Sequence, residues 1–162
     1  MSKTNLTQAI ELLGSTLLGK DMMLATAESC TGGLIGAYLT SVAGSSSWFT
    51  GGIIAYSNTV KQHVLGVNEE ALVSYGAVSA PVVEKMAAGA CRLLHTQAAI
   101  AVSGVAGPAG GSPLKPVGTV WIGWCVNGLV SSQHFLFEGD RESVRLQTVE
   151  QGINGLQLLI KV

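Results

Sequence analysis

The sequence contains few charged residues: 12% of its 162 residues are Asp, Glu, Lys or Arg, whereas 48% are hydrophobic. With a net charge of −1, no basic surface for nucleic acid or an anionic membrane is expected, and a substrate phosphate must be held locally. No continuous apolar segment approaches the roughly 20 residues of a membrane-spanning helix. The apolar surplus must therefore be buried, either in a sheet covered by helices on both faces or at a subunit interface.

Cysteine is also scarce. The three cysteines, Cys30, Cys91 and Cys125, are odd in number, widely spaced and set in apolar surroundings, so a disulfide framework is not expected. Residues 1–5 lack the continuous apolar segment of a signal peptide. Both observations favour a protein of the reducing cytoplasm.

Histidines that could bind a metal are few and poorly placed. His63, His95 and His134 do not have the spacing of metal ligands, and no cluster of carboxylates accompanies them. Metal ligands usually come as closely spaced sets of His, Cys and carboxylate side chains. We therefore expect a site without metal.

Hydrophobic periodicity divides the chain into alternating helices and strands. Helices are expected at residues 4–19, 31–42, 59 onward, 69–75, 79 onward and 141 onward, and strands at residues 22–25, 51–56, 98–102, 117–126 and 130–137. The last two strands are joined by Asn127-Gly128, a strong hairpin signal. Strand-helix alternation combined with one antiparallel hairpin predicts a three-layer α/β/α sandwich on a mixed sheet, as a single domain over residues 1–162.

The segment 25–33 is the centre of the functional prediction. It reads as the end of a strand, a turn of small residues and the start of a helix, a junction that directs free backbone N–H groups toward an anion or a developing oxyanion. Ser29 stands at the bend, where a nucleophile would be placed. An alternative is that Ser29 or Thr31 merely caps the helix, while Gly32 and Gly33 permit close packing.

Lys61 is the candidate general base. It follows an apolar strand in the expected first turn of a helix, where burial and the positive end of the helix dipole would both lower its pKa. Paired with Ser29 it would form a Ser-Lys dyad, with the N–H groups of residues 30–33 as the oxyanion hole. The alternative is an ordinary solvated surface lysine.

Two neighbours of Ser29 have alternative roles. Cys30 is a possible nucleophile, but its side chain is expected to point away from that of Ser29 and no histidine is paired with it, so a buried apolar role is favoured. Glu28 is a candidate for orienting a base or a substrate hydroxyl. A structural salt bridge is the other reading of Glu28.

Two further segments are candidates for binding phosphate. The glycine-rich loop 104–111 follows a buried strand, where α/β proteins bind ligands, although it matches no established nucleotide motif. Arg141 and Arg145 lie four residues apart on one face of the last helix, a spacing suited to gripping a phosphate. A solvated helix face is an equal alternative for the two arginines.

Taken together, the motifs resemble the CinA C-terminal domain, whose stand-alone members are nicotinamide-nucleotide amidases. The resemblance covers nearly the whole chain. It is carried, in order, by Ala27-Glu28-Ser29-Cys30-Thr31-Gly32-Gly33, Ala43-Gly44-Ser45-Ser46, Tyr56-Ser57-Asn58 with Lys61, Gly76-Ala77-Val78-Ser79, the 103–111 loop, Lys115-Pro116-Val117-Gly118-Thr119-Val120 and Gly139-Asp140-Arg141.

The resemblance implies hydrolysis of the carboxamide of nicotinamide mononucleotide to nicotinate mononucleotide and ammonia, in NAD salvage, by a homodimer without a cofactor. It implies that Ser29 is the nucleophile, that Lys61 is the base and that Tyr56 belongs to the same catalytic site. Substrate contacts are expected at Thr31, Gly32, Gly33, Ser46, Ser103, Gly104, Gly107, Arg141 and Arg145.

Two other classes of function fit the same motifs. A relative that keeps the pocket but has lost turnover would be a nucleotide-binding or regulatory protein. Ala109 and the segment 112–114 are the positions where this sequence departs from the family pattern. A purely structural or interaction domain is supported only by the high apolar content.

Overall fold

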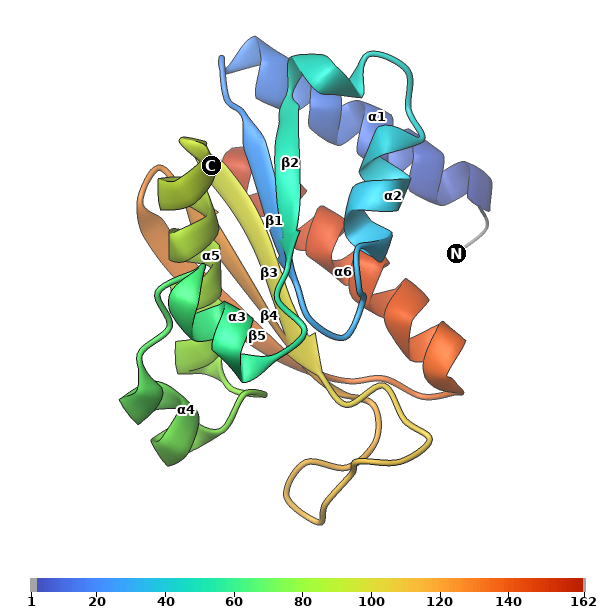
Figure 1. The fold of residues 1–162 in the computed structure, drawn as a ribbon. Helices are drawn as coiled ribbons and strands as arrows, with labels where there is room; N and C mark the ends of the chain where they lie inside the picture. Colours follow the sequence, from blue (N-terminus) through green and yellow to red (C-terminus); the bar gives the residue numbers. More distant parts are fainter. Residues whose placement is uncertain (1–2, 162) are drawn as a thin grey trace.

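A computed structural model describes residues 3–161; Met1 and Ser2, at the start of the segment predicted to lack a signal peptide, lie outside it. The described chain forms one five-stranded sheet in the order β2-β1-β3-β4-β5 (Figure 1). The strands are β1 (Leu24–Glu28), β2 (Phe49–Ile54), β3 (Ala98–Gly104), β4 (Thr119–Val126) and β5 (Leu129–Leu136). The predicted mixed sheet is confirmed. β1 pairs in parallel with β2 and with β3, whereas β4 pairs in antiparallel fashion with β3 and with β5.

The hairpin between β4 and β5 forms where the sequence predicts it. Val126 pairs with Leu129, and the two residues between them, Asn127 and Gly128, have φ angles of 49° and 82°. Positive φ at both central residues is typical of the tight turn whose twist matches that of paired strands. The Asn-Gly dipeptide thus fixes the register of this edge of the sheet.

Helices cover both faces of the sheet, as the sequence predicts, in three layers (Figure 1). The helices are α1 (Lys3–Gly19), α2 (Leu34–Thr40), α3 (Asn58–His63), α4 (Glu69–Tyr75), α5 (Ala80–Leu94) and α6 (Arg141–Lys161), with a short 3₁₀ helix η1 (Ser45–Ser47). The first, second and last α-helices lie on one face, and α3, α4 and α5 on the other. None of the helices within residues 3–161 has the length and apolarity that crossing a bilayer requires.

The central strand β3 explains why the sequence is so apolar. Ile100 and Val102 point into the core beneath α1 and α6, and Ala99 and Ala101 point into the core beneath α5. Side chains alternate between the faces of a strand, and both faces of β3 are fully buried. The alanines allow α5 to lie close to the sheet.

The turn before α2 is longer than the sequence predicts. The helix was expected from Thr31, yet it begins at Leu34, and β1 continues to Glu28 instead of ending at residue 25. The reason is local: Gly32 and Gly33 have φ angles of 60° and 100°, a left-handed conformation that a helix cannot contain. The four residues between Ser29 and the helix, residues 30–33, therefore belong to a turn.

Candidate active site

The site forms at the carboxyl edge of the sheet, between β1 and β2. After β1 the chain crosses to α2 on one face, and after β2 it crosses to α3 on the other. Neighbouring parallel strands whose connections leave in opposite directions open a crevice at their carboxyl ends, where α/β proteins bind ligands. Ser29 follows β1 and Lys61 is carried by α3, so the topology itself brings the predicted pair together.

Lys61 and Ser29 are in direct contact. Lys61 Nζ lies 3.0 Å from Ser29 Oγ and also contacts the carbonyl oxygens of Ala55 at 2.9 Å and Tyr56 at 3.4 Å. Ser29 is held in turn by its own N–H, which donates to the Val102 carbonyl of β3. A neutral amine has two N–H groups for the two carbonyls, and its lone pair is then free to accept the Ser29 hydroxyl proton.

Burial favours this neutral form. Lys61 is 1% exposed and Ser29 is 8% exposed. Loss of hydration lowers the pKa of the Lys61 amine below its ordinary value of 10.5, because an ammonium is stabilised by water more than a neutral amine is. Lys61 is the fourth of the six residues of α3 and so lies in its last turn as well as its first, and the dipole of so short a helix contributes little. Burial is therefore the main cause that lowers the pKa of Lys61 and prepares it as a base.

Glu28 occupies the beginning of α2, a role that the sequence reasoning missed. Its carboxylate accepts hydrogen bonds from the Thr31 hydroxyl at 2.6 Å and from the N–H groups of Gly33 at 3.1 Å, Ile35 at 3.0 Å and Gly36 at 2.9 Å. The first N–H groups of a helix have no partner within it, and a carboxylate satisfies them and the helix dipole together. The sequence did contain a signal for this capping role, because Glu28 is an acidic residue placed just before a glycine-rich helix start.

The cap changes the predicted oxyanion hole. With Gly33 bonded to Glu28, and Gly32 bonded to the Ser29 carbonyl, two donors of the expected set are committed. In the described part of the chain the N–H groups of Cys30 and Thr31 donate to no carbonyl or carboxylate of another residue. These two N–H groups are the remaining candidates for stabilising a negative oxygen next to Ser29.

Cys30 is poorly suited to be the nucleophile. Its side chain belongs to the core on the α1, α2 and α6 face, whereas Ser29 contacts Lys61 from α3 on the opposite face. Burial raises the pKa of the Cys30 thiol to about 12. Since only the thiolate is strongly nucleophilic, Cys30 has the features of a small buried residue.

Both predicted arginines point toward the site. Arg141 donates to the Gly107 carbonyl at 2.7 Å and to the Tyr56 hydroxyl at 3.3 Å. Arg145 donates from Nη2 to the Thr31 carbonyl at 2.8 Å, and its buried Nε has no partner in the described part of the chain. Arg141 is exposed and Arg145 is half-buried, and these hydrogen bonds favour a role at the site over a solvated helix face. Tyr56 joins the two halves of the site, since its carbonyl contacts Lys61 and its hydroxyl contacts Arg141.

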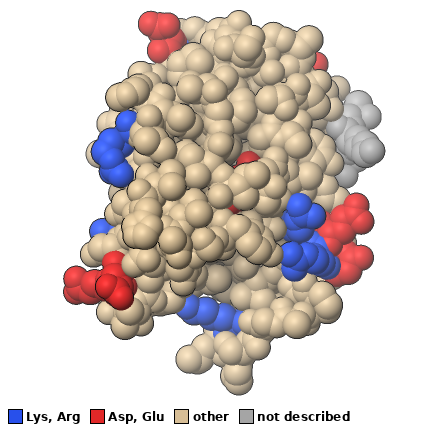
Figure 2. Space-filling model, in the orientation of Figure 1, with Lys and Arg blue, Asp and Glu red and all other residues tan. Residues whose placement is uncertain are grey.

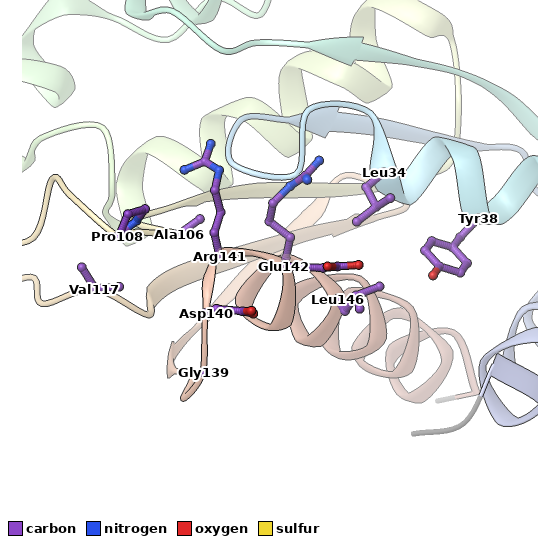
Figure 3. A pocket seen from close by; sticks show the side chains of 11 residues that line it. Leu34, Tyr38, Ala106, Pro108, Val117, Gly139, Asp140, Arg141, Glu142 and Leu146 are labelled. Carbon is purple, nitrogen blue, oxygen red and sulfur yellow. The ribbon is translucent and has the colours of Figure 1, made fainter.

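A pocket of about 790 Å³ opens beside the arginines (Figure 3). Arg141 extends from the start of α6, with Pro108 on one side of the pocket and Leu34 and Tyr38 on the other. Arg145 also lines the pocket, but neither residue of the dyad does. The pocket therefore adjoins the Ser29–Lys61 pair without including it. The two arginines connect them, because Arg145 contacts Thr31 in the turn after β1 and Arg141 contacts Tyr56.

The glycine-rich loop lies at the same edge of the sheet. Ser103 is buried at the end of β3, next to the Val102 carbonyl that holds Ser29, and Gly104 is the last residue of that strand. Gly107 meets Arg141 through its carbonyl. The loop therefore joins Arg141 to the site, and its Gly107 contributes a carbonyl acceptor there. No group of three or more His, Cys, Asp and Glu side chains within residues 3–161 is placed to hold a metal ion.

Ser46 is the predicted site residue that a single chain does not bring to the others. It lies in η1, before β2 begins, whereas Ser29 follows the end of β1. Because β1 and β2 are parallel, the two serines lie at opposite edges of the sheet, separated by the length of a five- or six-residue strand, roughly 15–20 Å.

The fold and the dyad define an α/β protein with a buried Ser-Lys pair, an arrangement suited to acyl transfer. Comparison with known proteins agrees with the motifs, because the family model described as the CinA C-terminal domain matches residues 6–160. The chain belongs to the CinA C-terminal domain family.

Relatives of similar length carry a functional name. The chain is 51% identical over 144 residues to the "Nicotinamide-nucleotide amidohydrolase PncC" of Pseudomonas putida, covering 89% of this chain and 90% of that protein. It is 43% identical over 157 residues to the protein of the same name from Escherichia coli K12, covering 96% and 95%. The crystal structure of a CinA superfamily protein from Klebsiella pneumoniae superposes with a TM-score of 0.92 at 35% identity, covering 99% of both chains.

Proposed function

We propose that the protein hydrolyses the carboxamide of nicotinamide mononucleotide, giving nicotinate mononucleotide and ammonia through a Ser29–Lys61 mechanism. The 3.0 Å contact between Lys61 Nζ and Ser29 Oγ, buried at the carboxyl edge of the sheet, is the observation that carries the proposal. The name of the relatives, nicotinamide-nucleotide amidohydrolase, supports the choice of substrate.

Acylation begins with the neutral Lys61 amine. The amine takes the Ser29 hydroxyl proton while Oγ attacks the carboxamide carbon, and the N–H groups of Cys30 and Thr31 stabilise the oxygen that becomes negative. The Lys61 ammonium then gives its proton to the amide nitrogen, which leaves as ammonia. The carbonyls of Ala55 and Tyr56, which contact Nζ, stabilise the transient ammonium.

Deacylation repeats the same steps with water. Lys61, neutral again, removes a proton from a water molecule that attacks the Ser29 ester, and the Lys61 ammonium returns a proton to Ser29 Oγ as nicotinate mononucleotide leaves. One lysine thus acts as base and acid in both halves of the reaction. The scheme uses no metal and no cofactor.

The 790 Å³ pocket is the proposed place for the rest of the nucleotide. Arg141 and Arg145 supply positive charge at its inner wall, and the buried Nε of Arg145, which has no partner within residues 3–161, is a donor available to a phosphate oxygen. Tyr56 lies between pocket and dyad, and Thr31, Gly32 and Gly33 form the turn beside them. We assign these residues, with Ser103, Gly104 and Gly107, to the substrate site.

The proposal includes a physiological setting. The protein is proposed to act in the cytoplasm, in the salvage of pyridine nucleotides, and to do so as a homodimer. The three free cysteines, Cys30, Cys91 and Cys125, are compatible with a reducing compartment. Exposed apolar side chains such as Tyr56, at 62% exposure, and Ile54, at 56%, support a surface that a second subunit covers.

The decisive experiment measures ammonia release from nicotinamide mononucleotide by the purified protein, with and without EDTA. We expect turnover at the same rate in both samples, with nicotinate mononucleotide as the second product. Thermal stabilisation by the nucleotide without ammonia release would instead support the nucleotide-binding alternative. Loss of the activity with EDTA, restored by a divalent metal, would contradict the metal-independent mechanism.

A further inference from the structure

Two motifs of the sequence play no part in the Ser29–Lys61 dyad. They are Gly76-Ala77-Val78-Ser79, which follows α4, and Lys115-Pro116-Val117-Gly118-Thr119-Val120, which leads into β4. The structure brings the two motifs together, because Lys115 Nζ donates to the carbonyl of Tyr75, next to Gly76, at 2.7 Å. This hydrogen bond joins positions that are 40 residues apart in the sequence.

The acceptor of this hydrogen bond lies at the end of a helix. The last carbonyl groups of a helix have no N–H partner within it and carry the negative end of its dipole, so a cation is favoured there. α4 ends at Tyr75, and Gly76 follows with a φ angle of 75°, which glycine adopts most easily. A Cβ atom at Gly76 would lie only 2.9 Å from Lys115 Nζ. Glycine at position 76 therefore serves both the turn and the approach of the ammonium.

Lys115 is the one charged residue of the β3–β4 loop, residues 105–118. In Figure 1 this loop extends from the body of the protein beyond the ends of β3 and β4. Figure 2, in the same orientation, shows few charged side chains on this face and a basic one beside the base of the protruding loop. Within the loop, the Ser112 N–H donates to the Lys115 carbonyl, and the Lys115 N–H donates to Ser112 Oγ. The turn that carries Lys115 is thus closed on itself, and the ammonium fastens it to α4.

The same loop forms one wall of the 790 Å³ pocket. Ala106, Pro108 and Val117 line the pocket from the loop, opposite the side chains of α2 (Figure 3). The three residues come from both arms of the loop. A displacement of the loop would therefore change the width of the pocket.

The two arms of the loop are in close contact. A Cβ atom at Gly107 would overlap the Val117 side chain, and one at Gly111 would lie 2.8 Å from the Val117 nitrogen. The Gly107 carbonyl in turn accepts a hydrogen bond from Arg141 at 2.7 Å. A change in the position of the arm that contains Lys115 is therefore passed on to Gly107 and to Arg141.

We propose that Lys115 is a positioning residue for the pocket: its ammonium holds the β3–β4 loop against the end of α4 and thereby places Val117 and the Gly107 carbonyl. The effect on the reaction rests on the proposed function, whereas the tether itself does not. The wall faces the part of the nucleotide that does not react, so it binds substrate and transition state alike. Loss of the tether should then raise KM and leave kcat unchanged.

Hydrogen exchange followed by mass spectrometry tests the tether without any assay of activity. Lys115→Met removes the ammonium and keeps an unbranched side chain. We expect peptides from residues 105–118 to exchange on the order of five times faster in this variant than in the wild type. Lys20→Met is the matched control, since it removes an exposed lysine before β1, at the other edge of the sheet, and its loop should exchange as in the wild type. Equal exchange of the loop in Lys115→Met and the wild type would refute the tether.

Steady-state kinetics with nicotinamide mononucleotide test the role of the tether in binding. We expect Lys115→Met to raise KM about fivefold and to change kcat by less than about twofold. Lys115→Arg keeps a positive charge of similar reach and should recover most of the lost affinity, and Lys20→Met should behave as the wild type. An active wild type combined with an unchanged KM in Lys115→Met, or with a loss in kcat alone, would refute this role. A wild type that releases no ammonia would instead overturn the proposed function and the role in binding with it, while the exchange result still decides the tether.

Discussion

Lys61 Nζ and Ser29 Oγ are 3.0 Å apart, although the two residues are separated by 32 positions in the sequence. The contact is made by two short connections that leave adjacent parallel strands toward opposite faces of the sheet. Both side chains are buried, and the lysine makes its hydrogen bonds with a hydroxyl and two carbonyl oxygens.

Removing either member of the dyad should abolish nearly all activity. Ser29→Ala and Lys61→Ala should each lower kcat by a factor on the order of 10³ or more, and the double variant should be no slower than the single ones, because the two groups act as a unit. Steady-state ammonia release measures this. Additive losses in the double variant would show that the residues act independently.

The activity should increase with pH through the pKa of Lys61. Burial lowers that pKa below 10.5, so the amine becomes a base at a lower pH than an exposed lysine would. A pH profile of kcat/KM for the wild type should therefore show an acidic limb that ends well below pH 10.5. Lys61→Arg is the matched control, since a guanidinium remains charged throughout and should leave no activity at any pH.

Lys61 should also make the stability depend on pH. Because its pKa is lower in the folded state than in the unfolded state, the unfolded state binds more protons between the two values, and stability rises with pH through that window. At lower pH the buried ammonium costs free energy. The gain in stability of Lys61→Met relative to the wild type should thus be largest below the folded-state pKa of Lys61 and shrink as pH rises from there to 10.5, as measured by urea denaturation at several pH values. A constant difference would argue against a lowered pKa.

Cys30 should be dispensable for chemistry. With a thiol pKa of about 12, the thiolate fraction at pH 8 is on the order of 10⁻⁴. Cys30→Ser should therefore lose less than about tenfold in kcat/KM, and iodoacetamide should not inactivate the wild type through Cys30. An inactive Cys30→Ser combined with an active Ser29→Ala would reverse the assignment of the nucleophile.

Glu28 should contribute to stability through α2. Glu28→Ala leaves the N–H groups of Gly33, Ile35 and Gly36 without their acceptor, which should cost on the order of 3 kcal/mol of unfolding free energy. Glu11 is exposed on α1, and Glu11→Ala is the control, with an expected change within about 0.5 kcal/mol. Equal effects of the two substitutions in urea denaturation would contradict the capping role.

Local chemistry allowed much of the fold to be predicted from the sequence. Asn127-Gly128 specified its hairpin because two left-handed residues fit that turn and few others. The run of apolar residues from Ala98 specified a strand buried on both faces. Predictions failed by a few residues where the backbone conformation of a turn decides an element boundary, as before α2, where two left-handed glycines delay the helix.

The sequence by itself determined the α/β/α class and the motifs that belong to the CinA C-terminal domain family, because periodicity, turn residues and motif order are local properties of the chain. It also nominated Ser29, Lys61, Arg141 and Arg145. Only the tertiary structure decided that Lys61 is buried against Ser29, that Glu28 caps α2, and that Ser46 stands at the far edge of the sheet. Burial, hydrogen-bond partners and the edge of the sheet at which a side chain lies depend on which strands become neighbours, and that is fixed by packing of the whole domain.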